Sequence, residues 1–194
     1  MKKSIILGVF LLSATFGFSQ KTDWKIDPSH SSINFEVAHM VVSDVVGKFD
    51  SFDGKILAEK ADFTDASISF TIQVSSVNTE NEKRDGHLQG ADFFDVAKYP
   101  TIEFKSKSLK VVSGNKYLLK GDLTMHGVTK EVELNVKYNG TIKDPWGGTR
   151  AGFKVSGEIV RADYGLLYNS ALEAGGVMIG ETVAINVNLE LLKQ

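Results

Sequence analysis

The chain contains no cysteine among its 194 residues. Disulfide bonds and lipid attachment to a cysteine thiol are therefore excluded, and burial of side chains must hold the fold together. Histidine is scarce as well: the i, i+2 and i, i+4 spacings typical of a local metal site do not occur among His30, His39, His87 and His126. We expect no metal site. For His30, which lies in the turn from Asp27 to Ser31, we expect a local structural role.

Signatures of common enzyme classes are also missing. There is no Gly-x-Ser-x-Gly elbow for a nucleophilic serine. Gly175, Gly176 and Gly180 lack the spacing of a phosphate-binding or dinucleotide-binding loop. Catalytic triads are assembled in space rather than in sequence, so an enzyme stays an alternative. The sequence favours a protein that is not an enzyme and has no cofactor.

Positive charge is not concentrated in any part of the chain. The sequence has 22 lysine and arginine residues against 24 acidic residues, and its formal net charge of −2 becomes about −4 without Lys2 and Lys3. Nucleic-acid-binding proteins carry a clustered basic surface, and no basic cluster is present here. Nucleic acid is therefore not an expected partner.

The sequence has a single long apolar run, which extends from Ile5 to Phe18 after two lysines. It is shorter than the roughly 20 residues that span a bilayer, and small residues follow it, as in a secretory signal. We interpret residues 1–19 as a signal peptide that is cleaved near Ser19 or Gln20. Residues 20–194 are then one domain, periplasmic or secreted, without a transmembrane anchor.

Most of the remaining chain alternates apolar and polar side chains, which is the pattern of strands with one buried face. The segment 66–75 is the clearest example, because every second residue from Ile68 to Val74 is apolar. Alternating segments begin near eight positions: Ile33, Phe49, Ile68, Ile102, Tyr117, Val132, Phe153 and Val183. Eight antiparallel strands form either a two-sheet sandwich or a closed barrel. Strands of about ten residues favour the barrel, which can enclose one apolar ligand.

Two local features modify this pattern. Phe49 and Phe52 differ in parity, which predicts a bulge or bend near Ser51. Asn139-Gly140 is typical of a tight hairpin turn, although Asn139-Gly140-Thr141 also matches a glycosylation sequon. We interpret these residues as a turn.

The stretch that follows Asn81 interrupts the alternation. The spacing of Asp85, Leu88 and Phe93 predicts short helical turns. These turns end before Pro100, because the residue that precedes a proline is disfavoured in a helix. We expect a short helical insertion around residues 81–98.

This insertion carries a polar group, Arg84, Asp85 and His87, just before two adjacent phenylalanines. One interpretation is an ion pair between Arg84 and Asp85 that fixes the insertion to the barrel. In the other, Arg84 or His87 lies at the mouth of the cavity and contacts a polar or phosphorylated head group, which a guanidinium binds well. Arg161, in a second irregular region near Tyr164, allows the same two interpretations.

Several short motifs follow one another along the chain. They are Trp24-Lys25-Ile26-Asp27-Pro28-Ser29-His30-Ser31, the segment from Phe35 to His39-Met40, Gly47-Lys48-Phe49, Ser76-Val77-Asn78-Thr79, Arg84-Asp85-Gly86-His87-Leu88, Phe93-Phe94-Asp95, Tyr99-Pro100, Gly121-Asp122-Leu123-Thr124, Gly127-Val128-Thr129-Lys130 and Arg161-Ala162-Asp163-Tyr164-Gly165. In this order and combination they resemble the YceI-like family of polyisoprenoid-binding proteins. The resemblance implies an all-β, extended, lipocalin-like barrel, exported to the periplasm and often a homodimer. It also implies an isoprenoid or other long-chain amphiphile bound in a central tunnel.

Together, the alternation and the resemblance predict a binding protein for transport, storage or sequestration of a polyisoprenoid or other long-chain lipid. The expected tunnel lining is Ile33, Phe35, Val37, Phe49, Ile68, Phe70, Ile72, Val74, Phe93, Phe94, Ile102, Phe104, Leu123, Leu134, Phe153, Val155, Leu166, Val183 and Ile185. The expected head-group or mouth residues are Arg84, Asp85, His87 and Arg161. Two alternatives are an isoprenoid-modifying enzyme that uses His87 and Asp85, and a structural protein whose barrel is packed solid.

Overall fold

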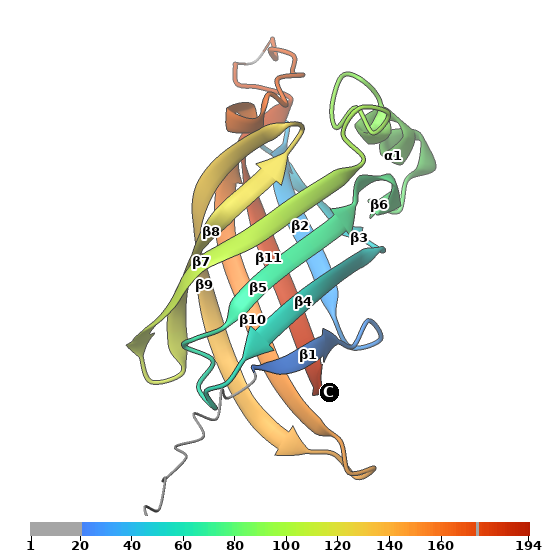
Figure 1. Ribbon diagram of the computed structural model, residues 1–194. Coiled ribbons are helices and arrows are strands. Elements are labelled where there is room, and N and C mark those ends of the chain that lie inside the picture. Colours follow the sequence, from blue (N-terminus) through green and yellow to red (C-terminus); the bar gives the residue numbers. More distant parts are fainter. Residues whose placement is uncertain (1–20, 174) are drawn as a thin grey trace, which may run out of the picture.

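The computed structural model describes residues 21–173 and 175–194, and within them the chain forms an antiparallel sheet that closes on itself (Figure 1). The predicted signal peptide, residues 1–19, lies outside the described residues. The strands are β1 (Thr22–Ile26), β2 (Ser32–His39), β3 (Ser43–Phe49), β4 (Phe52–Ala58), β5 (Ser67–Gln73), β6 (Val77–Asn78), β7 (Thr101–Ser113), β8 (Lys116–Met125), β9 (Val128–Lys143), β10 (Thr149–Val160) and β11 (Ile179–Lys193). The helices are η1 (Val74–Ser76), α1 (Glu82–Gln89) and η2 (Arg161–Tyr164).

The barrel closes because β11 pairs with two short strands from the start of the described chain. The end of β11 pairs with β1, where Leu191 lies opposite Ile26, and the rest of β11 pairs with β2. On the far side of these strands, β4 pairs with β1 and β3 pairs with β2. Thus β1 and β2 act as one bent strand, as do β3 and β4. Strands β5 and β6 are likewise joined, through η1, since they pair with β4 and β3. With these three pairs joined, the described residues form the predicted eight-stranded closed barrel.

The bend between β3 and β4 confirms the predicted break in parity. Strand β3 ends at Phe49 and β4 begins at Phe52. At the bend, the carbonyl of Ser51 accepts a hydrogen bond from Gln73 N at 2.9 Å. The neighbouring segment bends at the same level, through η1, so the partner strands stay in register.

The predicted hairpin turn at Asn139-Gly140 is wrong. Strand β9 continues through these residues to Lys143, and the register shifts between Tyr138 opposite Phe153 and Gly140 opposite Gly152. Asn139 is therefore the extra residue of a β-bulge, and Gly140 has a φ of +113°. An Asn-Gly pair suits a left-handed backbone in a bulge as well as in a turn.

The predicted helical insertion is confirmed as α1 followed by a series of turns. The side chain of Asn81 accepts a hydrogen bond from Arg84 N at 3.0 Å, which caps the start of α1. Beyond Gln89 the chain continues as turns. In Figure 1, α1 and these turns lie at the end of the barrel opposite β1. We call this the hinge end.

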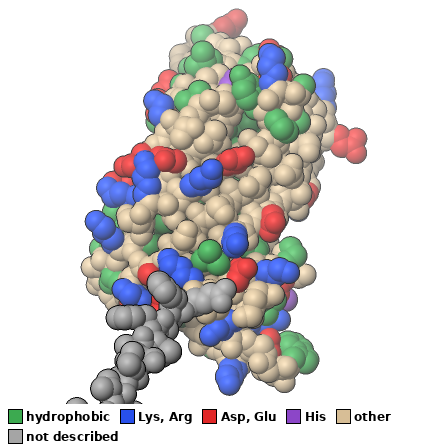
Figure 2. Space-filling model, in the orientation of Figure 1, with side chains coloured by type: hydrophobic (Ala, Val, Ile, Leu, Met, Phe, Trp, Pro, Cys, Tyr) green, Lys and Arg blue, Asp and Glu red, His purple; other side chains and the backbone are tan. Residues whose placement is uncertain are grey.

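The outer surface of the barrel is of mixed charge. On the face shown in Figure 2, acidic and basic side chains are interspersed. Lys107 of β7 forms ion pairs with Asp122 at 2.6 Å and with Glu131 at 2.9 Å, across three adjacent strands. The polar half of the alternation therefore faces water. Among the described helices, none has the length and apolar character that crossing a bilayer requires.

Candidate ligand-binding cavity

The apolar half of the alternation faces a cavity of about 460 Å³ inside the barrel. Its walls come from strands all around the barrel, and its hinge end is lined by residues of α1 and of the turns after it. The cavity lining includes these residues from the sequence-based prediction: Ile33, Phe35, Val37, Phe49, Ile68, Phe70, Ile72, Phe93, Phe94, Ile102, Phe104, Leu123, Leu134, Phe153, Val155, Leu166, Val183 and Ile185, together with Arg84, His87 and Arg161. The predicted periodicity thus locates one continuous internal surface.

Val74 differs from this prediction. Strand β5 ends at Gln73, and Val74 begins η1, where its amide donates to the carbonyl of Pro100 at 2.9 Å. Its side chain is 1% exposed and packs in the buried cluster beneath the hinge end, outside the cavity lining. The alternation holds only while the backbone stays extended, and here the backbone turns one residue before the pattern ends.

Several lining residues were missed by the sequence-based prediction. Val187, Leu189 and Leu191 continue the inward face of β11, and Leu119 and Val136 do the same for β8 and β9. The period-two pattern was a sufficient signal for these residues. Tyr168 and Met178, by contrast, lie in an irregular segment that has no periodicity to follow.

Phe63 closes the end of the cavity nearest β1. It lies in the loop between β4 and β5, is 2% exposed, and lines the cavity. Its ring centroid is 5.0 Å from those of both Trp24 and Phe153, and 5.5 Å from that of Tyr138. The backbone of Phe63 has a φ of +60°, which is costly for a bulky residue, so burial of the ring offsets this strain.

At the hinge end, Arg84 and Asp85 both bind Thr79 and do not form the predicted ion pair with each other. Arg84 Nε donates to Thr79 Oγ1 at 2.7 Å, and Arg84 Nη2 donates to the Thr79 carbonyl at 2.9 Å. Asp85 Oδ1 accepts from the amide and the hydroxyl of Thr79, at 2.9 and 2.5 Å. Buried Thr79 therefore fixes α1 to the chain after β6. Arg84 lines the cavity, whereas Asp85 faces a separate polar groove.

His87 belongs to an aromatic cluster that covers the cavity at the hinge end. The rings of His87, Phe93 and Tyr168 lie with each pair of centroids 5.0 Å apart. His87 Nε2 lies 3.2 Å from a carboxylate oxygen of Asp92, on the exposed side. The acid–base pair of His87 and Asp85 that an enzyme would use is thus not assembled here: His87 contacts Asp92, and Asp85 binds Thr79.

Arg161 is a buried cation at the same end. It is 6% exposed, and its guanidinium donates to backbone carbonyls, from Nε to Gly180 at 2.8 Å and from Nη1 to Leu166. Burial lowers the pKa of Arg161, an effect that Glu181 partly opposes. Neutral carbonyls do not cancel a charge as a carboxylate does, so a net positive charge is held against an apolar cavity.

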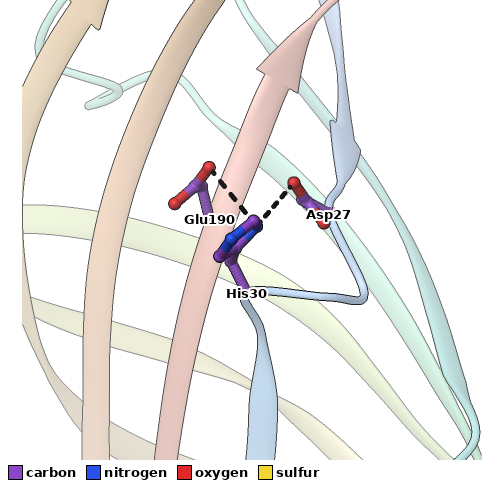
Figure 3. Close-up of side chains that lie close together, drawn as sticks. All are labelled: Asp27, His30 and Glu190. Atoms are coloured by element: carbon purple, nitrogen blue, oxygen red, sulfur yellow. Dashed lines mark hydrogen bonds and ion pairs between the residues drawn. The ribbon is translucent and has the colours of Figure 1, made fainter. Parts of the chain in front are cut away.

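A network of charged side chains lies on the outer face of the barrel, toward the end opposite the hinge end. His30 Nδ1 lies 3.0 Å from Asp27 and 4.0 Å from Glu190 (Figure 3). Within the described part of the chain, these three side chains form a group that could hold a metal ion. Arg150 Nη1 donates to both carboxylates, at 2.8 Å to Asp27, so a guanidinium already occupies the position between them. Hydrogen bonds from His30 and Arg150 lower the pKa of Asp27 to about 2. The network ties the turn before β2 to β10 and β11.

The closed barrel and its internal apolar cavity define the class of the chain, a lipocalin-like barrel protein. Residues 24–191 match the model of the YceI-like domain. The chain belongs to the YceI-like family. A UPF0312 protein of Staphylococcus aureus is 41% identical over 170 residues, which are 87% of this chain and 96% of that protein.

Solved structures share the fold. BcnA of Burkholderia cenocepacia superposes with a TM-score of 0.74 at 22% identity, covering 85% of this chain and 98% of BcnA. The Campylobacter jejuni YCEI protein has a TM-score of 0.69 at 26% identity, covering 97% of this chain and 99% of that protein. A polyisoprenoid-binding domain from Saccharophagus degradans has a TM-score of 0.63 at 21% identity, covering 88% of this chain and 98% of that domain.

Proposed function

We propose that this protein binds a polyisoprenoid or another long-chain amphiphilic lipid in the barrel cavity, and carries, stores or sequesters it without turnover. The observation that supports this most strongly is the cavity of about 460 Å³, whose lining is almost wholly apolar. Ligand sites commonly measure about 300 to 1,000 Å³ and combine apolar walls with a few polar groups. Burial of the lipid chain, at about 25 cal/mol per Å², would supply most of the affinity.

The polar groups at the hinge end support an amphiphile rather than a plain hydrocarbon. Arg84, His87 and Arg161 all line the cavity there, while Phe63, which packs against Trp24 of β1, lies at the other end of it. A ligand in this cavity would place its head group against the two guanidinium groups and its chain toward Phe63. Phosphate and other anionic oxygens suit this position, because guanidinium binds them through paired hydrogen bonds.

An extracytoplasmic location is part of the proposal. It rests on the leader predicted from the sequence and on membership of the YceI-like family, one of whose structural relatives is described as polyisoprenoid-binding. A protein that encloses a lipid chain would allow the lipid to cross an aqueous compartment. The proposed mature protein is residues 20–194.

Mass spectrometry of organic extracts from natively purified protein tests this function. We expect a long-chain lipid to be extracted from folded protein, and none from protein that was denatured and washed beforehand. Titration of the emptied protein with an isoprenoid alcohol should then restore binding. Folded protein that yields no lipid and also fails to bind the added alcohol would contradict the proposed function.

A substitution at Arg84 tests the position of the head group. Arg84→Ala should weaken binding of an isoprenoid diphosphate by about 1.5 to 3 kcal/mol more than binding of the matching hydrocarbon, because a charge-assisted hydrogen bond is lost. Thr79→Val is the control, since it removes the hydroxyl that Arg84 and Asp85 share but keeps the charge. Equal losses for both ligands in Arg84→Ala would instead assign Arg84 a purely structural role.

A further inference from the structure

The turn between β2 and β3 exposes three consecutive apolar residues at the hinge end of the barrel. Met40, Val41 and Val42 are 41%, 75% and 83% exposed. Such a run at the tip of a hairpin contributes little to the core. Contiguous apolar surface of this kind usually marks a place where the protein contacts another apolar surface.

The backbone conformation of this turn is unfavourable for the residues that occupy it. Met40 has a φ of +52° and Val41 a φ of +63°, in a turn closed by a hydrogen bond from Val42 N to the His39 carbonyl at 3.2 Å. Turns with positive φ at both central residues favour Asn and Gly, and a β-branched valine is strongly disfavoured there. Neither local conformation nor packing accounts for an exposed Met-Val pair at this position.

A second segment continues the apolar surface. The amide of Met40 donates to the carbonyl of Met178 at 2.8 Å, and Gly176 lies against the side chain of Val41. The same segment exposes Leu167, Tyr168 and Val177, at 69%, 36% and 37%. In Figure 1 it rises at the top of the barrel, above η2. We call the exposed apolar residues of the two segments the apolar rim: Met40, Val41, Val42, Leu167, Tyr168 and Val177.

The apolar rim continues into the cavity. His39 and Val45, which flank the turn between β2 and β3, line the cavity, as do Tyr168 and Met178 of the second segment. An apolar molecule could therefore move from the outer edge of the rim to the cavity wall with little exposure of its chain to water. This continuity favours a lipid surface as the partner, because lipid chains reside in such a surface.

The charged side chains near the apolar rim indicate which kind of lipid surface it can contact. The rim residues are uncharged, and two exposed residues close to them in the sequence, Asp44 and Glu173, are acidic. His87, which packs against Tyr168, lies beside the carboxylate of Asp92. An anionic surface would repel these carboxylates, whereas a zwitterionic surface would not. We propose that the apolar rim docks on a zwitterionic lipid surface and that the ligand enters and leaves the cavity there. This inference rests on the proposed function.

Vesicle flotation with the emptied full-length mature protein tests the docking surface. Wild-type protein should float with phosphatidylcholine vesicles, and Val41→Asp should reduce the bound fraction about tenfold or more. Val112→Asp is the matched control, because Val112 is 67% exposed near the β7–β8 turn at the opposite end of the barrel. Equal binding by Val41→Asp and wild type, or an equal loss in Val112→Asp, would overturn the proposal.

A second variant separates docking from any role of the turn in folding. The double substitution Met40→Asn and Val41→Gly places the preferred residues at the two positive-φ positions, so the thermal midpoint should rise or stay the same. Docking predicts that this variant nevertheless loses vesicle binding as Val41→Asp does. Retained vesicle binding by the double variant would overturn the role assigned to the rim.

Two further measurements distinguish failure of docking from failure of the proposed function. Val41→Asp should bind geranylgeraniol, delivered from a detergent-free ethanol stock, within about twofold of wild type, because Val41 does not line the cavity. Wild-type protein that binds this alcohol but not vesicles would refute docking alone. Sedimentation velocity tests whether a second copy of the chain binds the rim instead. If wild-type protein forms a dimer that Val41→Asp dissociates, and does not bind vesicles, the rim is an interface between two copies and the proposal is overturned.

Discussion

Tyr164 is almost completely buried, at 2% exposed. Burial raises its pKa to about 12, and its hydroxyl is the buried side-chain polar atom that lacks a hydrogen-bond partner in the described structure. An unsatisfied buried hydroxyl costs about 1 to 3 kcal/mol. Tyr164 therefore weakens the cluster beneath the hinge end even though its ring fills it.

Tyr164→Phe should leave the free energy of unfolding unchanged or raise it by about 1 kcal/mol, because the unpaired hydroxyl is removed and the ring is kept. Urea unfolding measures this. The control is Tyr138→Phe, whose lost hydroxyl lies 2.6 Å from Thr141 Oγ1 and whose removal should lower the free energy by about 0.5 to 1.5 kcal/mol. A loss at Tyr164 as large as at Tyr138 would show that the Tyr164 hydroxyl has a stabilising partner.

The Asp27 network predicts a pH dependence of stability. His30 and Arg150 lower the pKa of Asp27 from 3.8 to about 2, so the ionised carboxylate stabilises the fold above pH 3.8. As the pH falls through about 2, Asp27 is protonated and this contribution, on the order of 2 kcal/mol, is lost. The stability difference between wild type and Asp27→Asn should therefore shrink by that amount between pH 5 and pH 2. Urea denaturation at each pH measures this difference. A difference in free energy of unfolding that stays constant from pH 5 to pH 2 would contradict the stabilising role of ionised Asp27.

At the scale of residues, sequence periodicity locates most of the cavity wall, because inward and outward side chains alternate wherever the backbone is extended. It fails where the backbone turns. Val74 is assigned to the wall but begins η1, and Phe63 lies on the wall but comes from a loop with no pattern. The hydrogen-bond partner of Arg84 and Asp85 was also not predictable from the sequence. Both side chains bind Thr79 because α1 folds back against the chain that follows β6.

Among the elements, the loop between β4 and β5 determines how far the cavity extends. Phe63 contacts Trp24, Phe153 and Tyr138 and ends the cavity near β1. The carboxylate of Asp65 holds this loop by accepting hydrogen bonds from the amides of Glu59 and Lys60, at 3.0 and 3.1 Å. The length of chain that the barrel can enclose should therefore depend on one loop side chain.

Phe63→Ala should lower the free energy of unfolding by about 3 kcal/mol, the usual cost of removing a buried phenyl ring. It should also shift the lipids extracted from the protein toward longer chains, as measured by mass spectrometry. Trp146→Ala is the control, because this exposed side chain lies in the loop between β9 and β10 at the same end. An unchanged chain-length distribution in Phe63→Ala would refute the role of Phe63 as the end of the cavity.

Local signals in the sequence predicted some elements correctly and others incorrectly. The helical spacing of Asp85 and Leu88 and the parity change near Ser51 act through neighbouring residues, so the sequence reveals them. The Asn139-Gly140 pair is ambiguous, because a bulge within β9 uses the same left-handed backbone as a turn. Only the partner strand β10, whose register decides between the two, identifies the bulge.

For the whole molecule, closure of the barrel depends on contacts between the two ends of the described chain. Strands β1 and β11 pair with Trp24 opposite Lys193, and Arg150 connects the turn before β2 to β11. Alternation alone is equally compatible with a sandwich, because it fixes which side chains are buried and not which strands are neighbours. The eight strands were therefore predictable one by one, whereas their closure was inferred from strand length and family resemblance.

If the barrel encloses a cavity that binds lipid, substitutions at two valines should have opposite effects. Val155 lines the cavity and is only partly buried, whereas Val74 is packed outside it. In ligand-free protein, Val155→Phe should leave the thermal midpoint close to that of wild type, because the ring has room. Val74→Phe should destabilise by about 1 to 3 kcal/mol, because it overfills a packed site.

The most direct test is native mass spectrometry of wild type, Val155→Phe and Val74→Phe after equal exposure to an isoprenoid lipid, together with their ligand-free thermal midpoints. We predict that wild type and Val74→Phe carry the lipid, that Val155→Phe does not, and that only Val74→Phe melts at a clearly lower temperature. A Val155→Phe protein that is destabilised as strongly as Val74→Phe, together with wild type that binds no lipid, would show a solid core and contradict the claim.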